Sequence, residues 1–447
     1  MDTPVCDFVK KYRARDTVRL HMPGHKGVAA LGPEPMDITE IDGADVLYHS
    51  QGIIRESEEN AAALFGAART VYSAEGSSLS IRGMLYLLTI RAKRLGKAPL
   101  IAAGRNAHKV FLTAAALLGL EIAWIYPEKR ESLTACEITG EALDVFLSQL
   151  PEKPVAVYIT SPDYLGNVAD IPVLSSVCRR HGVLLAVDNA HGAYLRFLPE
   201  DRHPITLGAD LCCDSAHKTL PVLTGGGYLH ISKSAPAEFR ELAETAMSMF
   251  ASTSPSYLIL LSLDQANRYL SEGYRERLAA YCGEVSAMKR RLTMAGFSVA
   301  GSEPLKITLR TKPFGYAGTE AAGYLETRGI VCEYADPDFL VLMLTPESGG
   351  DALAALEKAL LTLPRKAPLP EASLPFPAPK RLMSPREALL SPSREVPVKE
   401  GLGKILAAPT VSCPPAVPVV VSGEEIDEDA IRVMAYYGIT TCRVVEG

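Results

Sequence analysis

The sequence lacks the features that direct a chain to a membrane, to secretion or to nucleic acid. No apolar run among its 447 residues reaches the roughly 18 that are needed to span a bilayer. The N-terminal stretch MDTPVCDFVKKYRARD is charged and has no apolar core, so it does not resemble a secretory signal. The formal net charge of −6 gives no electrostatic reason to expect nucleic acid or an anionic membrane as a partner.

Cysteine is scattered along the chain without a pattern. The nine cysteines include no C-x-x-C spacing, and the only adjacent pair is Cys212 and Cys213. An odd number of cysteines without ligand spacing argues against a disulfide framework and against a zinc site. We therefore expect reduced thiols, no metal and a cytoplasmic protein.

The middle of the chain alternates between helical patterns and short apolar strands. With 47% apolar and 22% charged residues the composition is that of an ordinary globular protein. From about residue 55 to 235 the alternation predicts an α/β fold with a mostly parallel sheet. Ligands of such sheets bind beyond the carboxyl ends of the strands. The stretch GGGYLHI is expected to return as one more strand.

The rest of the chain changes character twice. A long helical pattern runs from about 258 to 290, and a smaller α+β pattern follows it. After Leu363 the sequence becomes rich in proline, which is typical of a linker, here with one short helix. Short strands at AAPTVSC and AVPVVVSG and a closing helix at DEDAIRVMAYYG are expected after about residue 395. We predict an N-terminal segment (1–35), a large cofactor-binding domain (36–285), a small α+β domain (286–365), and the linker with a C-terminal domain (366–447).

Two residues suited to cofactor chemistry follow predicted strands. Asp188 closes the apolar strand VLLAVD, and Lys218 follows DLCCDSAH. A lysine amine can form a Schiff base with the aldehyde of pyridoxal phosphate. A carboxylate beside the pyridine nitrogen keeps that nitrogen protonated, because an opposite charge favours the charged form. Their order predicts a pyridoxal-phosphate site.

A phosphate site is suggested by the stretch EGSSLS (75–80), a Gly-Ser-Ser turn directly before a helix. The N–H groups at a helix N-terminus bind phosphate, and Ser215 and His217 can add donors. Each of these residues also has a structural interpretation. A strand-end aspartate often caps a turn, a loop lysine is usually solvated, and a Gly-Ser-Ser turn can serve only as a helix cap. Their order and spacing together favour the cofactor site.

The surrounding motifs resemble those of the ornithine/lysine/arginine decarboxylases, a branch of the aspartate-aminotransferase-like (fold type I) pyridoxal-phosphate enzymes. SAHKTLPVLTGGGYLHI (215–231) resembles their lysine motif. The resemblance covers nearly the whole chain, and its compact length is similar to the shorter biosynthetic type, which lacks an N-terminal receiver-like domain. Further stretches that match in order are HMPGHKG (21–27), the run from DITEIDGADV to VYSAEGSS (37–78), RNAHKV (105–110), ITSPDYLGNVADI (159–171), AVDNAHGAY (186–194), STSPSYLILLSLD (252–264) and MSPREAL (383–389).

The resemblance implies a role for each matching residue. Lys218 resembles the Schiff-base lysine, Asp188 the partner of the pyridine nitrogen, and His108 the imidazole that stacks on the cofactor ring. His191 is expected near cofactor and substrate. Ser252 and Thr253 match a pair that contacts the phosphate of the neighbouring subunit, which implies a homodimer with shared active sites and leaves further assembly open. The expected phosphate contacts are Ser77, Ser78, Ser215 and His217.

The implied reaction is the decarboxylation of a basic amino acid to its amine, for polyamine metabolism. After carbon dioxide leaves, His217 or Lys218 is expected to protonate Cα. Glu333, before the apolar strand FLVLML, is the candidate anchor for the basic side chain. Arginine is the first choice, ahead of lysine and ornithine. The alternatives are an aminotransferase or another fold type I enzyme, because fold does not decide which bond breaks, and a non-catalytic member used for binding.

The chain also departs from the pattern that it resembles. Glu75 and Ser80 stand where asparagine and glycine are more usual, and Asp163 stands where threonine is common. The segment SCPPAVPVVVSGE resembles a C-terminal YPPGIP…PGE segment, with Cys413, Ala416 and Ser422 replacing the usual residues. These departures leave the lysine and the aspartate in place and put details of the phosphate loop and of substrate selection in question.

Overall fold

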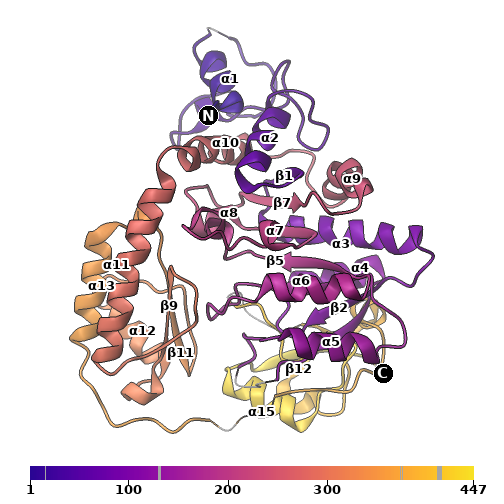
Figure 1. Ribbon diagram of the computed structural model, residues 1–447, viewed down its shortest axis with the longest axis vertical. Helices are drawn as coiled ribbons and strands as arrows, with labels where there is room; N and C mark the ends of the chain where they lie inside the picture. Colours follow the sequence, from indigo (N-terminus) through magenta and orange to yellow (C-terminus); the bar gives the residue numbers. More distant parts are fainter. Residues whose placement is uncertain (16, 129–131, 373, 375, 410–414, 447) are drawn as a thin grey trace. The chain divides into compact units, whose positions relative to one another are not determined.

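The computed structural model describes residues 1–15, 17–128, 132–372, 374, 376–409 and 415–446 (Figure 1). It divides into two compact units, each built from segments that are discontinuous in sequence. The first unit contains residues 1–98, 150–161 and 170–277, and the second contains residues 99–149, 162–169 and 278–447. The boundaries expected at residues 35, 285 and 365 stay predictions. Among the described helices, none combines the length and the apolar character that crossing a membrane requires.

The first unit is built on a strand series in the order β1-β7-β6-β5-β4. Strands β4, β5 and β6 run parallel, and β7 is antiparallel to both β6 and β1. The expected parallel α/β core is confirmed, as is the return of GGGYLHI as a strand. The strands are β1 (Arg69–Ser73), β4 (Ala156–Thr160), β5 (Leu184–Asp188), β6 (Leu211–Asp214) and β7 (Gly227–Ile231).

The parallel strands bring acidic side chains to one edge. β5 ends at Asp188, whose register partner in β6 is Cys213, and β6 ends at Asp214. The next residues fold into the short helix α8 (Ala216–Thr219), which holds Lys218, before the chain returns in β7. A side chain at Gly227 would lie 2.8 Å from the Asp214 carbonyl oxygen and 3.0 Å from the Gly76 carbonyl carbon. Only glycine therefore allows β7 to pass this close to the lysine-bearing turn.

Helices of the first unit form two groups around these strands. α1 (Pro4–Arg13), α2 (Ile53–Phe65) and α10 (Tyr257–Ser271) contact one another, and α3 (Gly76–Arg94) packs on β6, β7 and α9 (Figure 1). The prediction of a single long helix at 258–290 is wrong. The chain breaks between α10 and α11 (Tyr274–Met294) at Gly273, which has φ +68°. The other helices of the first unit are α6 (Ile171–Arg180), α7 (Pro204–Leu207), α9 (Ala237–Ser248) and the 3₁₀ turns Glu34–Met36 and Ala193–Phe197.

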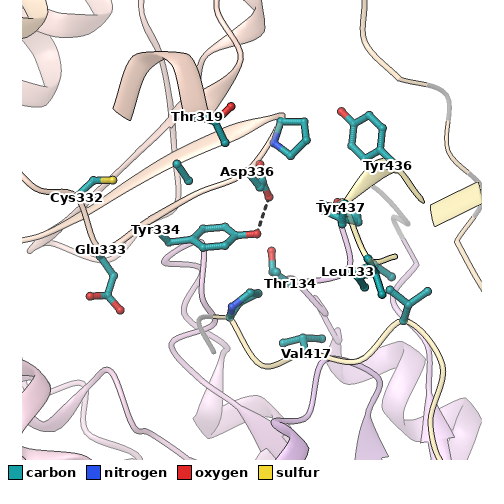
Figure 2. A pocket seen from close by; sticks show the side chains of 16 residues that line it. Leu133, Thr134, Thr319, Cys332, Glu333, Tyr334, Asp336, Val417, Tyr436 and Tyr437 are labelled. Atoms are coloured by element: carbon teal, nitrogen blue, oxygen red, sulfur yellow. Dashed lines mark hydrogen bonds between the residues drawn. The ribbon is translucent and has the colours of Figure 1, made fainter. Parts of the chain in front are cut away.

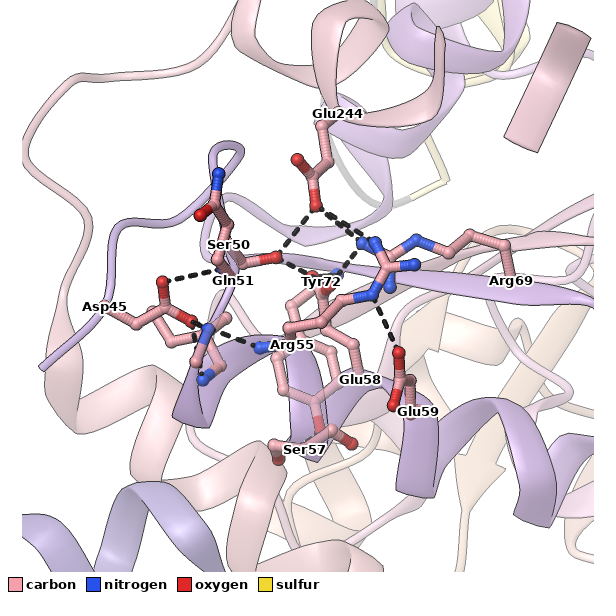
Figure 3. Close-up of polar contacts among 12 residues, drawn as sticks. Asp45, Ser50, Gln51, Arg55, Ser57, Glu58, Glu59, Arg69, Tyr72 and Glu244 are labelled. Atoms are coloured by element: carbon pink, nitrogen blue, oxygen red, sulfur yellow. Dashed lines mark hydrogen bonds and ion pairs between the residues drawn. The ribbon is translucent and has the colours of Figure 1, made fainter. Parts of the chain in front are cut away.

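A buried ionic network ties the loop before α2 to β1 and α9 (Figure 3). Arg69 Nη2 donates to Glu58 Oε2 at 2.7 Å and to Glu244 Oε1 at 2.6 Å. Burial raises the pKa of Glu58 to about 7, against the opposing charge of Arg69. Asp45 accepts the backbone N–H groups of Gln51 and residues 52 and 54, which closes the loop onto the start of α2. The segment that carries the long 37–78 match is thus held by charged side chains.

The second unit contains three strand groups. β2 and β3 form a parallel pair; a second sheet has the order β10-β11-β9-β8 and a third the order β12-β14-β13. Its strands are β2 (Leu100–Gly104), β3 (Glu121–Ile125), β8 (Ser298–Ala300), β9 (Lys306–Arg310), β10 (Tyr334–Ala335), β11 (Phe339–Met343), β12 (Ser393–Pro397), β13 (Leu406–Ala408) and β14 (Thr441–Val445). Its helices are α4 (Lys109–Leu118), α5 (Gly140–Gln149), α12 (Gly318–Glu326), α13 (Gly349–Leu361), α14 (Pro385–Leu390), α15 (Glu428–Tyr436) and the 3₁₀ turns Lys312–Phe314, Pro346–Ser348 and Val398–Gly401.

The C-terminal part departs from expectation in its strands. The short helix in the proline-rich stretch and the closing helix are confirmed as α14 and α15. The stretch AVPVVVSG forms no strand over its described residues 416–423. The third sheet instead uses β12, within the stretch taken for a linker, and β14, after the closing helix. These strands pair across more than 40 residues of sequence, which a local pattern does not reveal.

Candidate active site

The carboxylate of Asp188 is buried at the end of β5 and is held by neutral donors. Tyr158 donates its hydroxyl to Oδ2 at 3.0 Å, and Ala190 donates its backbone N–H to Oδ1 at 3.2 Å. The Cys213 thiol lies 3.6 Å from Oδ1. These contacts fix the orientation of the carboxylate without neutralising its charge. A buried negative charge of this kind suits a cationic ring nitrogen.

The amine of Lys218 lies beside an imidazole. Its Nζ is 3.1 Å from Nε2 of His191, a buried residue that follows Asp188 by three positions. A lysine ammonium can only donate, so His191 accepts through Nε2 and carries its own proton on Nδ1. The structure therefore brings Lys218 and His191 together, and the expected place of His191 near cofactor and substrate stays a prediction.

The turn before α3 meets the turn after β6. Ser215 donates its hydroxyl to the Ser77 hydroxyl at 2.7 Å, and both side chains are buried. The backbone N–H of Gly76 donates to the Gly225 carbonyl, and a side chain at Gly76 would lie 3.5 Å from Cε1 of His217. Ser77, Ser215 and His217 thus gather at the N-terminus of α3, where N–H groups bind phosphate. Ser78 lies one position further along the same helix and is half-buried.

His217 is held in one tautomer. Its Nδ1 donates to the Gly226 carbonyl at 2.9 Å. Burial lowers the pKa of His217 and the charge of Lys218 lowers it further, against the hydrogen bond to Gly226. The neutral ring then presents Nε2 as an acceptor. A phosphate dianion near Nε2 would favour the doubly protonated ring, which donates from both nitrogens.

Two residues that differ from the decarboxylase motifs, Glu75 and Ser80, lie at or just after this turn. Glu75 directly precedes α3, and its Oε1 accepts the backbone N–H of Ser252 at 2.8 Å within the same chain. Ser252 and Thr253 are exposed, and their contact with a neighbouring subunit stays a prediction. Ser80 is buried, and its hydroxyl has no hydrogen-bond partner within the described part of the chain.

Behind the lysine-bearing turn lies a buried cluster that sequence reasoning missed. Asp214 Oδ2 accepts from Nε2 of His203 at 2.9 Å and from Nε2 of His230 at 3.2 Å. Its Oδ1 accepts from Asn189, the neighbour of Asp188, at 2.7 Å. Burial alone would raise the pKa of Asp214, but the two histidines outweigh burial and hold it well below its usual range. The cluster therefore joins β5, β6 and β7 through one permanent carboxylate.

The hydrogen bonds of this cluster argue against a metal, although two histidines and a carboxylate lie close enough to one another to hold an ion. The backbone N–H of Ile205 donates to Nδ1 of His203 at 3.3 Å, so Nδ1 is an acceptor and Nε2 carries the proton. A protonated Nε2 cannot ligate an ion. A metal-bound histidine would instead donate from Nδ1 to an acceptor.

Two expected site residues belong to the second unit. His108 precedes α4, and its Nδ1 accepts the backbone N–H of Val110 at 3.2 Å. Its stacking on the cofactor ring stays a prediction. Glu333 is exposed beside β10, and its Oε1 accepts the Tyr164 hydroxyl at 2.8 Å. Tyr164 belongs to the matched segment ITSPDYLG, and the role of Glu333 as an anchor for the substrate stays a prediction.

The departure at Asp163 has a structural explanation. Its side chain is buried and accepts the backbone N–H groups of Leu165 and Asn167 and the Asn167 amide at 2.8–3.0 Å. Lys306 Nζ lies 3.3 Å from the Asp163 carbonyl oxygen and pairs with the buried Glu303 at 3.1 Å. The carboxylate therefore closes its own loop. Burial raises its pKa to about 6.

This raised pKa predicts a pH-dependent stability. Because folded Asp163 holds its proton more tightly than unfolded Asp163, the free energy of unfolding falls as pH rises from about 4 to about 6. Asp163→Asn cannot ionise, so we expect it to gain about 2–3 kcal/mol on the wild type between about pH 4 and pH 7. Denaturation midpoints of both proteins across this range measure the difference. Asp351→Asn in α13, an exposed position, is the control, and a pH-independent difference at 163 would refute the prediction.

Three residues near the C-terminus also differ from the motif that the chain resembles: Cys413, Ala416 and Ser422. Ala416 is buried with φ +56°, a backbone conformation that costs a residue with a side chain about 1 kcal/mol or more. Its carbonyl accepts the Lys109 N–H, beside His108. Ser422 is buried. Cys413 lies outside the described residues.

The residues of the first unit fit pyridoxal phosphate. They offer an amine at Lys218, a buried carboxylate held by neutral donors at Asp188, and hydroxyls with N–H groups at the start of α3. Asp188 and Lys218 were found from the sequence because an apolar run ends at one and a glycine triplet follows the other. Tyr158, Cys213 and Asp214 were missed, since only strand register brings them to the site.

The chain is similar to proteins of one family. The sequence matches the family model described as Orn/Lys/Arg decarboxylase, major domain, over residues 3–300. The arginine decarboxylase of Bacillus subtilis is 28% identical over 464 residues, which cover 96% of this chain and 92% of the relative. The arginine decarboxylase of Halalkalibacterium halodurans is 29% identical over 462 residues, covering 95% and 91%.

The structural comparison confirms the fold expected from the motifs. The lysine decarboxylase LdcF of Francisella novicida superposes with a TM-score of 0.79 at 15% sequence identity, covering 99% of this chain and 81% of that chain. At this identity the likeness concerns the fold alone. That fold is the fold type I arrangement of pyridoxal-phosphate enzymes.

Proposed function

Because the chain belongs to the ornithine/lysine/arginine decarboxylase family, whose members are pyridoxal-phosphate enzymes, we propose that it converts arginine to agmatine and carbon dioxide. The observation that carries the proposal is Lys218 on a tight turn in the same unit as the buried, strand-end Asp188. Arginine is preferred to lysine and ornithine because several of the relatives are arginine decarboxylases. A role of the amine in polyamine metabolism is part of the proposal.

The cofactor is proposed to be pyridoxal phosphate, held mainly by residues at the carboxyl end of β5, after β6 and at the start of α3. Lys218 would bind its aldehyde carbon, Asp188 its ring nitrogen, and Ser77, Ser78, Ser215 and His217 its phosphate. His108 would lie on the ring and His191 beside Lys218. When bound, the protonated ring accepts the electron pair released as the bond between Cα and the carboxylate breaks.

Proton transfer to Cα is assigned to Lys218 ahead of His217. A lysine amine is normally protonated at neutral pH, and His191 Nε2 can hold its ammonium in one orientation. His217 has its Nδ1 proton engaged by the Gly226 carbonyl, and its lowered pKa leaves Nε2 mostly without a proton to transfer. Tyr158 and Ala190 donate to the Asp188 carboxylate and would hold it in one orientation toward the ring nitrogen.

The catalytic unit is proposed to be a homodimer. Ser252 and Thr253 lie on an exposed segment next to the α3 turn, and the matching motif implies that they contact the phosphate of a neighbouring subunit. Sedimentation and gel filtration of the purified protein would show a dimer or a larger assembly. A monomer that retains full activity would contradict this part of the proposal.

The first test is the amine product. The protein loaded with cofactor is incubated separately with arginine, lysine and ornithine, and the amines are identified by mass spectrometry. Agmatine as the dominant amine would support the proposal, and cadaverine or putrescine would change the substrate. A keto acid without carbon dioxide would indicate an aminotransferase. A protein that binds no cofactor would indicate a non-catalytic role.

Glu333→Gln is expected to raise KM for the basic substrate by about ten- to a hundredfold with a smaller effect on kcat. The carboxylate would pair with the distal cation in ground state and transition state alike, and losing such a charge-assisted hydrogen bond costs about 1.5–3 kcal/mol. Glu326→Gln, near the end of α12, is a control at a similarly exposed carboxylate. An unchanged KM would remove Glu333 from the substrate site.

A further inference from the structure

Asp188 lies on β5 between two strands that both turn polar side chains toward it. In the parallel register Asp188 stands opposite Thr160 of β4 and Cys213 of β6. Side chains at paired positions, or two positions apart, on neighbouring strands point to the same face of a sheet. Cys213 therefore shares the face of Asp188, and so does Tyr158, two positions before Thr160. The register brings a phenol and a thiol to one carboxylate from opposite sides.

The two groups contact different oxygens of the Asp188 carboxylate. The Tyr158 hydroxyl donates to Oδ2 at 3.0 Å. The Cys213 sulfur lies 3.6 Å from Oδ1, which also accepts the Ala190 N–H at 3.2 Å. Since each carboxylate oxygen has two lone pairs, Oδ1 is fully used and Oδ2 keeps one lone pair for a further donor.

The phenol and the thiol act only as donors. Tyr158 and Cys213 are fully buried beside the buried Asp188. Burial raises the pKa of both groups well above its usual range, and the charge of Asp188 raises it further. Both groups therefore keep their protons. Hydrogen bonds to the charged form of a carboxylate favour that form over the protonated one.

The donors to Asp188 differ in charge from those of the neighbouring carboxylate. Asp214 binds two histidines, which hold its pKa well below its usual range. Among the described residues, the donors to Asp188 are neutral: a phenol, a thiol and a backbone N–H. The balance between the ionised and the protonated carboxylate therefore depends on how strongly Tyr158 and Cys213 donate.

We propose that Tyr158 and Cys213 are positioning residues that keep a shared proton on the ring nitrogen of the bound cofactor and off the Asp188 carboxylate. Tyr158 would share Oδ2 with the ring N–H, and Cys213 would hold Oδ1 in place. Without these donors the carboxylate would take the proton, and a neutral ring accepts electrons less readily. The proposal rests on the cofactor assignment in the proposed function and is independent of the choice of substrate.

The test is solid-state nitrogen NMR of the holoenzyme, loaded with cofactor that is isotopically labelled at its ring nitrogen. The resonance position reports how far this nitrogen is protonated, and we expect a protonated nitrogen in the wild type. Tyr158→Phe removes the hydroxyl and keeps the ring. It should shift the proton equilibrium toward the carboxylate by about tenfold or more, the equivalent of about 1.4 kcal/mol.

Cys213 offers a graded pair of variants that keeps the proposal testable if Tyr158→Phe does not fold. Cys213→Ala removes the weaker donor and should shift the equilibrium in the same direction by about threefold. Cys213→Ser places a hydroxyl donor at the same position and should keep the nitrogen protonated. Cys178→Ala removes another buried thiol of the first unit, in α6, and is the control for lost packing.

A second tyrosine–aspartate pair supplies the matched control for Tyr158 (Figure 2). In the second unit Tyr334 donates its hydroxyl to Oδ2 of the buried Asp336 at 2.9 Å. Tyr334→Phe removes the same type of hydrogen bond, so it should lower the denaturation midpoint to a similar extent. It should leave the nitrogen resonance at its wild-type position. If Tyr158 had only a structural role, the two variants would give the same resonance.

Two results would overturn the proposal: an unprotonated ring nitrogen in the wild type, or a resonance that neither Tyr158→Phe nor Cys213→Ala moves. A wild type that binds no cofactor would refute the cofactor assignment and this proposal with it. Bound cofactor with an unmoved resonance would refute this proposal alone. The product of the decarboxylation assay does not enter these measurements, so an amine other than agmatine would change the substrate only.

Discussion

Replacing Lys218 with alanine is expected to lower kcat for decarboxylation by about 10⁴-fold or more. The variant loses both the covalent partner of the cofactor and the ammonium proposed to protonate Cα, and a positioned proton donor alone contributes up to about 10⁴-fold. His191 would remain but cannot form the covalent link. Single-turnover carbon dioxide release measures the effect. Lys233→Ala, which removes an exposed lysine of the same unit, is the matched control.

A second readout makes this prediction independent of turnover. Borohydride reduction of the loaded wild type should attach the cofactor permanently to the peptide that contains Lys218. Peptide mass spectrometry would show the added mass there and show it absent in Lys218→Ala. Attachment at another lysine, or a variant that keeps activity within about tenfold of the wild type, would remove Lys218 from its proposed role.

Replacing Asp214 with alanine is expected to lower the free energy of unfolding by about 3–5 kcal/mol. The substitution leaves the Nε2–H groups of His203 and His230 buried without an acceptor, and each orphaned donor costs about 1–3 kcal/mol. The Asn189 amide loses its acceptor as well. Since Asn189 follows Asp188, and Asp214 precedes Ser215, cofactor affinity should fall together with stability.

Asp170→Ala is the comparison for this effect. Asp170 accepts the backbone N–H of Val173 at the start of α6, and losing a helix cap costs about 1 kcal/mol. Denaturation midpoints measure stability, and the absorbance of bound cofactor on titration measures affinity separately. If Asp214→Ala destabilises the protein no more than Asp170→Ala does, the two histidines have found other acceptors. The Asp214 cluster then does not stabilise the junction of β5, β6 and β7.

The sequence was informative where chemistry is local. Asp188 and Lys218 each sit beside a recognisable signal, an apolar run in one case and a glycine triplet in the other. The glycines have a physical reason, since a side chain at Gly227 would meet the Asp214 carbonyl. The break at Gly273 was missed because one glycine within an amphipathic pattern is compatible with a continuous helix.

What the sequence could not predict depends on register between distant strands. Tyr158 is 30 residues from the carboxylate that it binds, and His203 and His230 lie on either side of Asp214 at 11 and 16 residues. None of these residues stands in a pattern of its own. The Asp163 departure was similarly ambiguous until its hydrogen bonds to Leu165 and Asn167 identified it as a loop-closing residue.

The order in which the chain supplies the two units constrains its biogenesis. The polypeptide passes between them five times, at residues 98/99, 149/150, 161/162, 169/170 and 277/278. A ribosome therefore delivers β2 and β3 long before β8 to β14, and the first unit is incomplete until residue 277 has emerged. Domains usually fold as units from the N-terminus during synthesis. Here segments of both units emerge before either unit is complete, so a stop codon after the family-matched region would leave β8 without its partner β9 and apolar surface exposed to chaperones.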